Sequence, residues 1–129
     1  MTTYMLDTDS VSFALRGVGN VAKRVLRHKP SHICISAITL AELRYGIEKK
    51  RSAKLAQLVH SFVHGIHVAP FDEAAALQFG RVAASLVGSP IGEFDALLAA
   101  HSISLGAILV TNNVRHFGQV PGLDIENWG

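Results

Sequence analysis

The sequence predicts an α/β fold in which helices cover both faces of a central, mostly parallel sheet. Short, continuous apolar runs at Tyr4–Leu6, Ile33–Ile35 and Ala107–Val110 have the length of strands that are buried on both faces. Segments with apolar residues at helical spacing separate these runs, and strands separated by helices pair in parallel. The 129 residues contain no internal repeat or linker, so we expect one domain over residues 1–129.

The first elements follow this alternation. After the strand at Tyr4–Leu6, Asp9 or Ser10 is expected to cap a helix, because a short oxygen side chain accepts hydrogen bonds from the free amides of a first turn. Gly17–Asn20 ends that helix, and a second helix runs to about His28.

The strand at Ile33–Ile35 leads into a helix that Ser36 or Thr39 caps and that continues at helical spacing to Ile47. Another helix covers about Ser52 to Val63. The remaining elements are a strand at 67–69, a helix from a cap at Asp72 to residue 86, a loop at 87–92, a helix over about 94–105, the strand at 107–110 and a possible edge strand in the alternating tail 123–128.

Composition narrows the class of protein. Hydrophobic residues make up 49% of the chain and the mean hydropathy is +0.29, so some apolar surface is expected to enter a subunit or partner interface. No apolar run approaches the roughly 20 residues of a membrane-spanning helix, and Asp7 and Asp9 come too early for a signal peptide. We expect a cytoplasmic oligomer without membrane spans, in which Cys34 is a buried apolar residue.

Basic residues cluster although the net charge is only +2. These clusters are suited to contacting phosphates, but they equally fit solvated helix faces. They are Lys23, Arg24, Arg27 and Lys29 in one segment, and Lys49, Lys50, Arg51 and Lys54 in another.

Four oxygen-bearing side chains mark a candidate site. Asp7 and Asn113 follow the first and the most apolar strand, at the edge where open α/β sheets bind ligands. Glu42 and Asp95 lie in otherwise apolar helical segments, where a carboxylate is costly unless a positive charge compensates it. A divalent cation is one such charge, although Asp95 is also well placed merely to favour a helix macrodipole.

Such a cluster suits phosphodiester cleavage. Mg²⁺ and Mn²⁺ prefer oxygen ligands, and two or three carboxylates can hold a cation that neutralises a phosphate and activates water. Asp7, Glu42 and Asp95 could supply these carboxylates.

Several motifs together resemble the PIN-domain ribonucleases, and within them the VapC toxins of bacterial toxin-antitoxin pairs. The resemblance covers the full length of the chain, and the combination of motifs is specific. The motifs are Met5–Ser10 with Leu-Asp-Thr, Ile35–Gly46 with Ala-Glu-Leu, Pro90–Asp95 with Ala99–His101, Leu109–Asn113 with Val-Thr-Asn-Asn, and the ending Val120–Trp128.

The resemblance implies a three-layer PIN sandwich and a Mg²⁺- or Mn²⁺-dependent endoribonuclease, usually a homodimer. It implies a cognate VapB-type antitoxin as inhibitor, operator DNA bound only through that antitoxin, and RNA as substrate. A tRNA is the candidate RNA, with the initiator anticodon loop as the candidate cleavage region. Asp7, Glu42 and Asp95 match the family's metal-binding acids, Thr8 its hydroxyl that orients water or substrate, and Asn113 its fourth position, in a motif that Thr111 opens.

The chain departs from the family pattern at three positions. Asn113 stands where many members have Asp, His116 stands where some have Glu, and Asp9 replaces a more usual Asn. Asn113 can contribute only a neutral oxygen or a bridging water. Asp9 either restores the missing charge or only caps the first helix.

Other interpretations remain open from the sequence. A phosphatase-like site at Asp7 and Asp9 would need a later lysine, and none follows Lys54. A catalytically weakened module that acts through antitoxin and operator binding is the non-enzymatic alternative. Aromatic residues such as Tyr45 and Trp128 could stack on bases or pack against protein. We expect His60, His64 and His67 to form a solvent-facing run and His101 to be a structural histidine within its helix.

Overall fold

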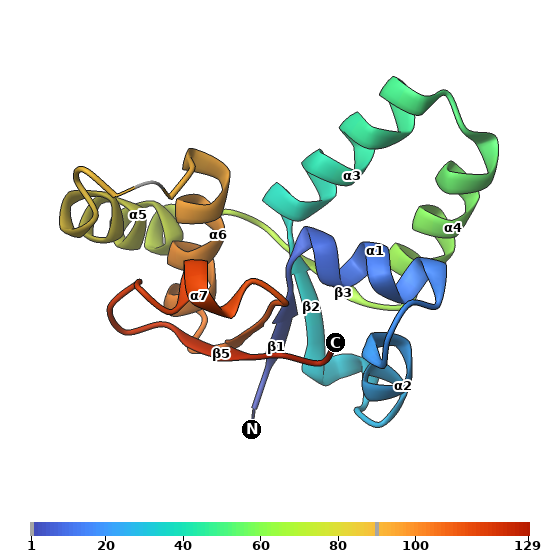
Figure 1. The fold of residues 1–129 in the computed structure, drawn as a ribbon, viewed down its shortest axis with the longest axis horizontal. Coiled ribbons are helices and arrows are strands. Elements are labelled where there is room, and N and C mark those ends of the chain that lie inside the picture. The colour runs from blue at the N-terminus through green and yellow to red at the C-terminus, as the bar shows by residue number, and fades with distance from the viewer. Residues whose placement is uncertain (1, 90) are drawn as a thin grey trace.

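A parallel five-stranded sheet forms the centre of the computed structural model, which describes residues 2–89 and 91–129 (Figure 1). The sheet order is β3-β2-β1-β4-β5, and its strands are β1 (Tyr4–Leu6), β2 (Ile33–Ser36), β3 (His67–Ala69), β4 (Ile108–Val110) and β5 (Asp124–Glu126). The helices are α1 (Thr8–Arg16), α2 (Val21–Leu26), α3 (Ala37–Lys50), α4 (Ala53–His64), α5 (Glu73–Ser85), α6 (Glu93–Ser104) and α7 (Val114–Phe117), with a 3-10 turn, η1 (Pro30–His32), before β2. The predicted α/β class is confirmed.

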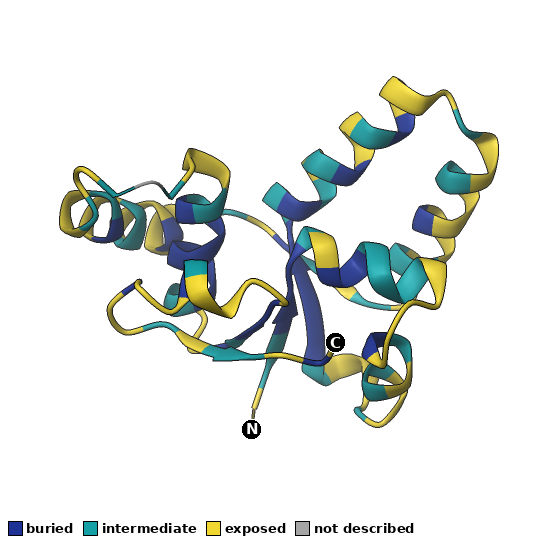
Figure 2. Ribbon diagram, viewed as in Figure 1, coloured by how far each residue is buried: buried dark blue, intermediate teal, exposed yellow. Residues whose placement is uncertain are grey.

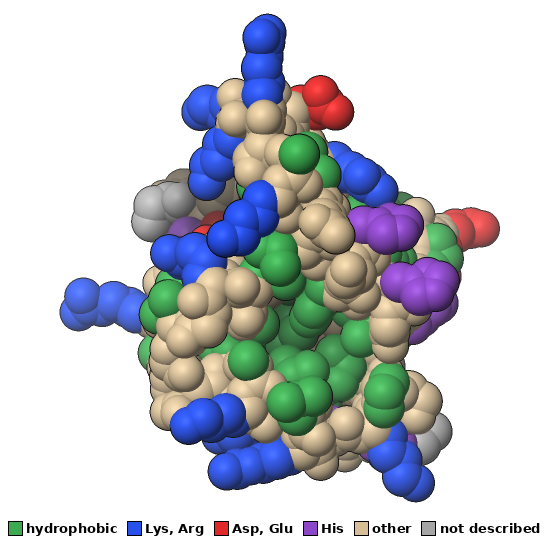
Figure 3. Space-filling view, turned by 90° about the vertical axis from the view of Figure 1, so that its right-hand side faces the viewer, with side chains coloured by type: hydrophobic (Ala, Val, Ile, Leu, Met, Phe, Trp, Pro, Cys, Tyr) green, Lys and Arg blue, Asp and Glu red, His purple; other side chains and the backbone are tan. Residues whose placement is uncertain are grey.

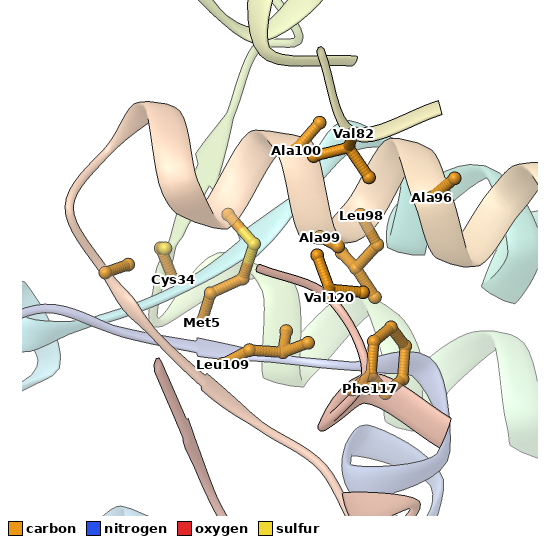
Figure 4. Close-up of a cluster of buried hydrophobic side chains, with 11 residues drawn as sticks. Met5, Cys34, Val82, Ala96, Leu98, Ala99, Ala100, Leu109, Phe117 and Val120 are labelled. Atoms are coloured by element: carbon orange, nitrogen blue, oxygen red, sulfur yellow. The ribbon is translucent and has the colours of Figure 1, made fainter. Parts of the chain in front are cut away.

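Helices lie on both sides of the sheet because successive residues of each strand point to opposite faces. Met5 and Leu109 pack with α5 and α6 in one apolar core, which Figure 4 shows in close-up. Leu6 and Val110 pack in a second core with α1, α3 and α4. Figure 2 shows the resulting pattern, in which the central strands β1, β2 and β4 are largely buried and the outer helix surfaces are exposed. Continuous apolar strands are what burial on two faces requires.

Parallel pairing brings the carboxyl ends of the central strands to one edge. Leu6 is in register with Val110 of β4, and the Asp7 N–H continues the ladder by donating to the Val110 carbonyl at 3.0 Å. Ser36 ends β2, the neighbour on the other side of β1. The helices α1 and α3 begin directly at these strand ends, so their first turns lie at this edge.

Most predicted helix starts are confirmed, with one correction. Ser36, Ser52 and Asp72 each accept a hydrogen bond from an amide in the first turn that follows. The expectation that Asp9 or Ser10 caps α1 is wrong, because Asp7 itself is the cap and its Oδ1 accepts the Ser10 N–H at 2.8 Å. The strand therefore passes into the helix without a loop.

Other predictions fare differently along the chain. The edge strand in the tail is confirmed as β5, whereas α7 and η1 were not foreseen because each is only a single turn. The predicted loop at 87–92 includes Pro90, which lies outside the described residues. In the part of the chain that the structure describes, no helix is both long enough and apolar enough to cross a membrane.

Candidate active site

A polar cleft of about 110 Å³ opens at the carboxyl edge of the sheet. All five residues that the sequence indicated contribute to its lining, although they come from four separate segments of the chain. The lining residues are Asp7, Thr8, Asp9, Glu42, Asp95, Leu98, Asn113 and Phe117.

Asp7 lies at the bottom of this arrangement, between β1 and α1. Its side chain is only 5% exposed, and its carboxylate accepts the Ser10 amide as the cap of α1. Burial raises the pKa of Asp7, and the nearby Asp9 carboxylate raises it further, while hydrogen bonds from Thr111 and Ser10 lower it. The raised pKa means that this carboxylate lacks enough positive charge around it.

Glu42 reaches the cleft from the second turn of α3. Thr8 Oγ1 donates a hydrogen bond to Glu42 Oε1 at 2.7 Å, which fixes the side chain against the start of α1. Burial is the largest cause that raises the pKa of Glu42, and the Thr8 hydroxyl opposes it. The carboxylates of Asp95, Asp9 and Asp7 raise this pKa as well, so the acids are close enough to repel one another.

Asp95 lies in the first turn of α6 and contacts a residue that the sequence did not assign to the site. His116 Nε2 is 2.9 Å from Asp95 Oδ2. His116 belongs to α7, whose existence the sequence pattern did not predict. A four-residue helix leaves no periodic signal, so only the motif position, where some family members have Glu, pointed to this residue.

Asn113 is the cap residue of α7 and stands two positions after the buried Thr111. Its backbone N–H donates to Thr111 Oγ1 at 3.0 Å, and its exposed side chain lines the cleft. As a neutral amide it adds an oxygen to the cleft but no negative charge.

His101 has the structural role expected of it. It is completely buried on α6, and its Nδ1 shares a 2.7 Å hydrogen bond with the Ser36 hydroxyl. Burial lowers the pKa of His101, which keeps the imidazole neutral, while Asp72 and the Pro70 carbonyl act against this. Because Ser36 also caps α3, this bond joins the helix that carries Glu42 to the helix that carries Asp95.

The donors fit a hard divalent cation in kind and in charge. Four carboxylates, including that of Asp9, a hydroxyl and an amide oxygen line one cleft, and they are the ligands that Mg²⁺ and Mn²⁺ prefer. Among the described residues, no three His, Cys, Asp or Glu side chains are grouped tightly enough to hold one ion as they stand. Asp7, Glu42 and Asp95 are each turned toward a hydrogen-bond partner of their own, on Ser10, Thr8 and His116.

Several residues outside the cleft were candidates for structural or solvent-facing positions. His60, His64 and His67 are exposed, as expected of a solvent-facing run, and Cys34 is buried. Trp128 is only 1% exposed, so this ring packs in the protein and is not available to stack on a base. Tyr45, by contrast, is 67% exposed.

Comparisons with known proteins identify the family of the chain. The family model for the PIN domain matches residues 4–123. The tRNA(fMet)-specific endonuclease VapC of Salmonella typhimurium is 36% identical over 131 aligned positions, which cover 99% of each chain. Ribonuclease VapC2 of Haemophilus influenzae is 35% identical, again over 99% of each chain.

Solved structures give the same result. The chain superposes on a DNA-bound VapBC complex from Salmonella typhimurium with a TM-score of 0.89, at 36% identity over the whole of both chains. VapBC2 from Rickettsia felis, bound to a DNA fragment from its promoter, gives a TM-score of 0.91 at 32% identity, covering 99% of this chain and 100% of that one. The chain therefore belongs to the PIN-domain family and, within it, to the VapC ribonucleases.

Proposed function

We propose that this protein is a Mg²⁺- or Mn²⁺-dependent endoribonuclease, and the toxin of a toxin-antitoxin pair. The observation that carries the proposal is the convergence of Asp7, Glu42 and Asp95 on one cleft, where burial and neighbouring carboxylates raise the pKa values of Asp7 and Glu42. A fold tolerates such uncompensated carboxylates where a ligand of opposite charge uses them.

Each residue has a definite part in this proposal. Asp7, Glu42 and Asp95 would hold the cation, which when bound neutralises the scissile phosphate and activates a water for in-line attack, leaving 5′-phosphate and 3′-hydroxyl ends. Thr8 holds Glu42 in place and can orient water or substrate with its hydroxyl. Asn113 contributes a neutral contact to the cleft.

The surface beside the cleft suits single-stranded RNA. An apolar hollow of about 510 Å³ shares Thr8 and Glu42 with the edge of the cleft and is otherwise lined by Ala41, Tyr45 and Phe94. Tyr45 and Phe94 are exposed aromatic residues, and unpaired bases stack on such side chains. We therefore propose a loop of RNA as substrate, and the tRNA(fMet) specificity in the name of the Salmonella relative makes a tRNA the first candidate.

A second groove suits an antitoxin. It has a volume of about 410 Å³, and Figure 3 shows apolar side chains in a hollow with basic side chains around it. Leu15, Leu43 and Leu55 line the groove together with Arg16 and Lys50. The groove also includes Thr8, Asp9 and Glu42, so an antitoxin segment bound there would lie against the catalytic acids. Relatives are found in VapBC complexes, which supports a VapB-type partner for this chain.

The remaining parts of the proposal are assembly and location. We propose that the free toxin is a homodimer, because Leu77, Val87 and Phe94 leave apolar surface exposed on the single chain. We propose that it acts in the cytoplasm, where its RNA is found, and that it reaches operator DNA only through the antitoxin.

Brief expression of the chain without antitoxin tests the activity. New RNA ends should appear within minutes, and sequencing of these ends identifies the target and the cleavage position. The purified protein should cleave the same RNA when Mg²⁺ or Mn²⁺ is present and stop when a chelator is added. Binding of antitoxin without any metal-dependent cleavage would instead identify a catalytically weakened PIN module.

A further inference from the structure

His116 lies on α7, a helix that the sequence pattern did not predict, and it contacts Asp95 of the candidate site. Its Nε2 lies 2.9 Å from Asp95 Oδ2, a charge-assisted hydrogen-bond distance. An ionised carboxylate can only accept, so Nε2 carries the proton and donates. The opposite tautomer would place two acceptors against each other.

The approach of the imidazole is from outside the cleft. Asp95 lines the cleft, whereas His116 is not among the described residues that do so. The His116 side chain is 20% exposed and the Asp95 side chain 41% exposed, so the histidine is the more enclosed partner. Oδ2 of Asp95 is thus engaged by the imidazole, which leaves Oδ1 free of that contact.

The short helix that carries His116 is itself fixed. Phe117 is 2% exposed in the core beneath α6, and its ring meets the His116 ring edge-on with centroids 5.4 Å apart. At Gly118 a Cβ atom would lie 2.6 Å from the Val114 carbonyl oxygen, so the turn after α7 is tightly closed. His116 is therefore presented to Asp95 on a rigid support.

Asp95 needs such support more than the other acids do. Asp7 is held by the amide of Ser10 and Glu42 by the hydroxyl of Thr8. Asp95 lies in the first turn of α6, whose cap residue, Gly92, has no side chain to fix that turn. We propose that His116 is a positioning residue, which orients Asp95 so that one carboxylate oxygen stays directed at the cation.

This inference rests on the metal dependence put forward under Proposed function and assigns a role in that site to His116. Partners that hydrogen-bond a metal-binding carboxylate typically change metal affinity by about 10–100-fold when removed. We therefore expect His116→Ala to weaken Mn²⁺ affinity by about 10-fold or more. We expect His116→Gln, whose amide can donate from nearly the same position, to recover most of that loss.

Mn²⁺ titration of the full-length protein by calorimetry tests the proposal without relying on cleavage. His60→Ala is the matched control, because His60 is an exposed histidine on α4, away from the cleft. Unfolding in a chelator is measured in parallel. Here the His116→Ala midpoint should stay near that of the His60→Ala variant, since a residue with a merely structural role would lower it in the absence of metal.

The outcomes are distinct. Weakened binding by His116→Ala with recovery by His116→Gln supports the positioning role. Unchanged or tighter binding by His116→Ala overturns it, and tighter binding would mean that the imidazole competes with the cation for Asp95. If the wild-type chain binds no Mn²⁺ or Mg²⁺ at all, the metal dependence itself fails, and the role of His116 fails with it.

Discussion

Asp7 has two separable roles, and a pair of substitutions distinguishes them. Its Oδ1 accepts the Ser10 N–H at 2.8 Å and so caps α1, while its charge is buried beside other carboxylates. Asp7→Asn keeps an oxygen acceptor for the cap and removes the charge. Asp7→Ala removes both. Either variant should lose RNA cleavage, but the two should differ in stability.

The difference in stability between the two variants follows from the lost helix cap. Truncation to Ala leaves a buried amide without its acceptor, which costs about 1–2 kcal/mol. For a chain of this length, each kcal/mol corresponds to a shift of about 3–5 °C in Tm. Asp7→Asn avoids this loss and relieves the desolvated charge, so in metal-free buffer at pH 7 its Tm should equal or exceed that of the wild type. Its Tm should also exceed that of Asp7→Ala by roughly 3–10 °C.

The pH dependence has a definite sign. Because the folded-state pKa of Asp7 is raised, ionisation destabilises the fold as pH rises through that pKa, and the penalty is absent once the carboxyl is protonated in both states. The advantage of Asp7→Asn over the wild type should therefore be largest at pH 7 and should shrink as pH falls toward the ordinary Asp value of 3.8.

Thermal unfolding followed by circular dichroism at pH 7 and pH 4 measures these differences, and an RNA cleavage assay with Mn²⁺ measures activity. Loss of a metal-binding carboxylate should reduce cleavage by more than about 100-fold, since even its outer partners can change activity by 10–100-fold. An Asp7→Asn variant as unstable as Asp7→Ala would refute the idea that the charge is uncompensated. Wild-type cleavage by Asp7→Asn would remove Asp7 from the metal site.

Three further results are expected. Thr8→Val should raise the pH below which cleavage is lost, because the Thr8 hydroxyl lowers the pKa of Glu42. A pH-rate profile measures this, with Thr8→Ser as the control that keeps the hydroxyl. If Thr8→Val loses cleavage at the same pH as the wild type, the hydrogen bond is unimportant. Ser36→Ala should destabilise the fold by about 1–2 kcal/mol more than Ser52→Ala in urea unfolding, because both lose a helix cap but only Ser36 also bonds the buried His101. Equal losses would contradict this. Mg²⁺ should raise Tm at pH 7, and this effect should disappear as pH falls toward 3.8–4.5, because the carboxyls that would bind the ion then take up protons. A Tm increase that does not depend on pH would place the bound ion elsewhere.

Sequence patterns predicted the sheet and most helices because their signals are local and periodic. The strand at Ala107–Val110 is apolar throughout, and Asp72 stands directly before an apolar helical stripe. The start of α1 was misplaced by one turn. Strand β1 ends at Leu6 and the helix begins at Thr8, so a residue assigned to metal binding also serves as the cap. A pattern that gives each residue one role cannot anticipate this overlap.

The candidate site was predictable as a set of residues but not as a geometry. Position at strand ends placed Asp7 and Asn113 at the correct edge, and the cost of a carboxylate in an apolar helical segment pointed to Glu42 and Asp95, which the motif resemblance supported. Two of the hydrogen bonds that hold the acids come from side chains more than 20 positions away, namely His116 for Asp95 and Thr8 for Glu42. Contacts of this range have no signature in the spacing of one sequence.

The way the acids are held explains why their partners matter as much as the acids. The strands that end at the cleft have only three or four residues each, so they fix where Asp7 and Asn113 begin but not how the other carboxylates point. That orientation depends on helix starts and on single hydrogen bonds between elements. The positive ends of α1 and α6 face the cleft and partly offset the negative charge there, yet the pKa values of Asp7 and Glu42 remain raised. Helix dipoles and hydrogen bonds are therefore sufficient to position the acids and insufficient to neutralise them, which leaves an excess of negative charge that a bound cation would neutralise.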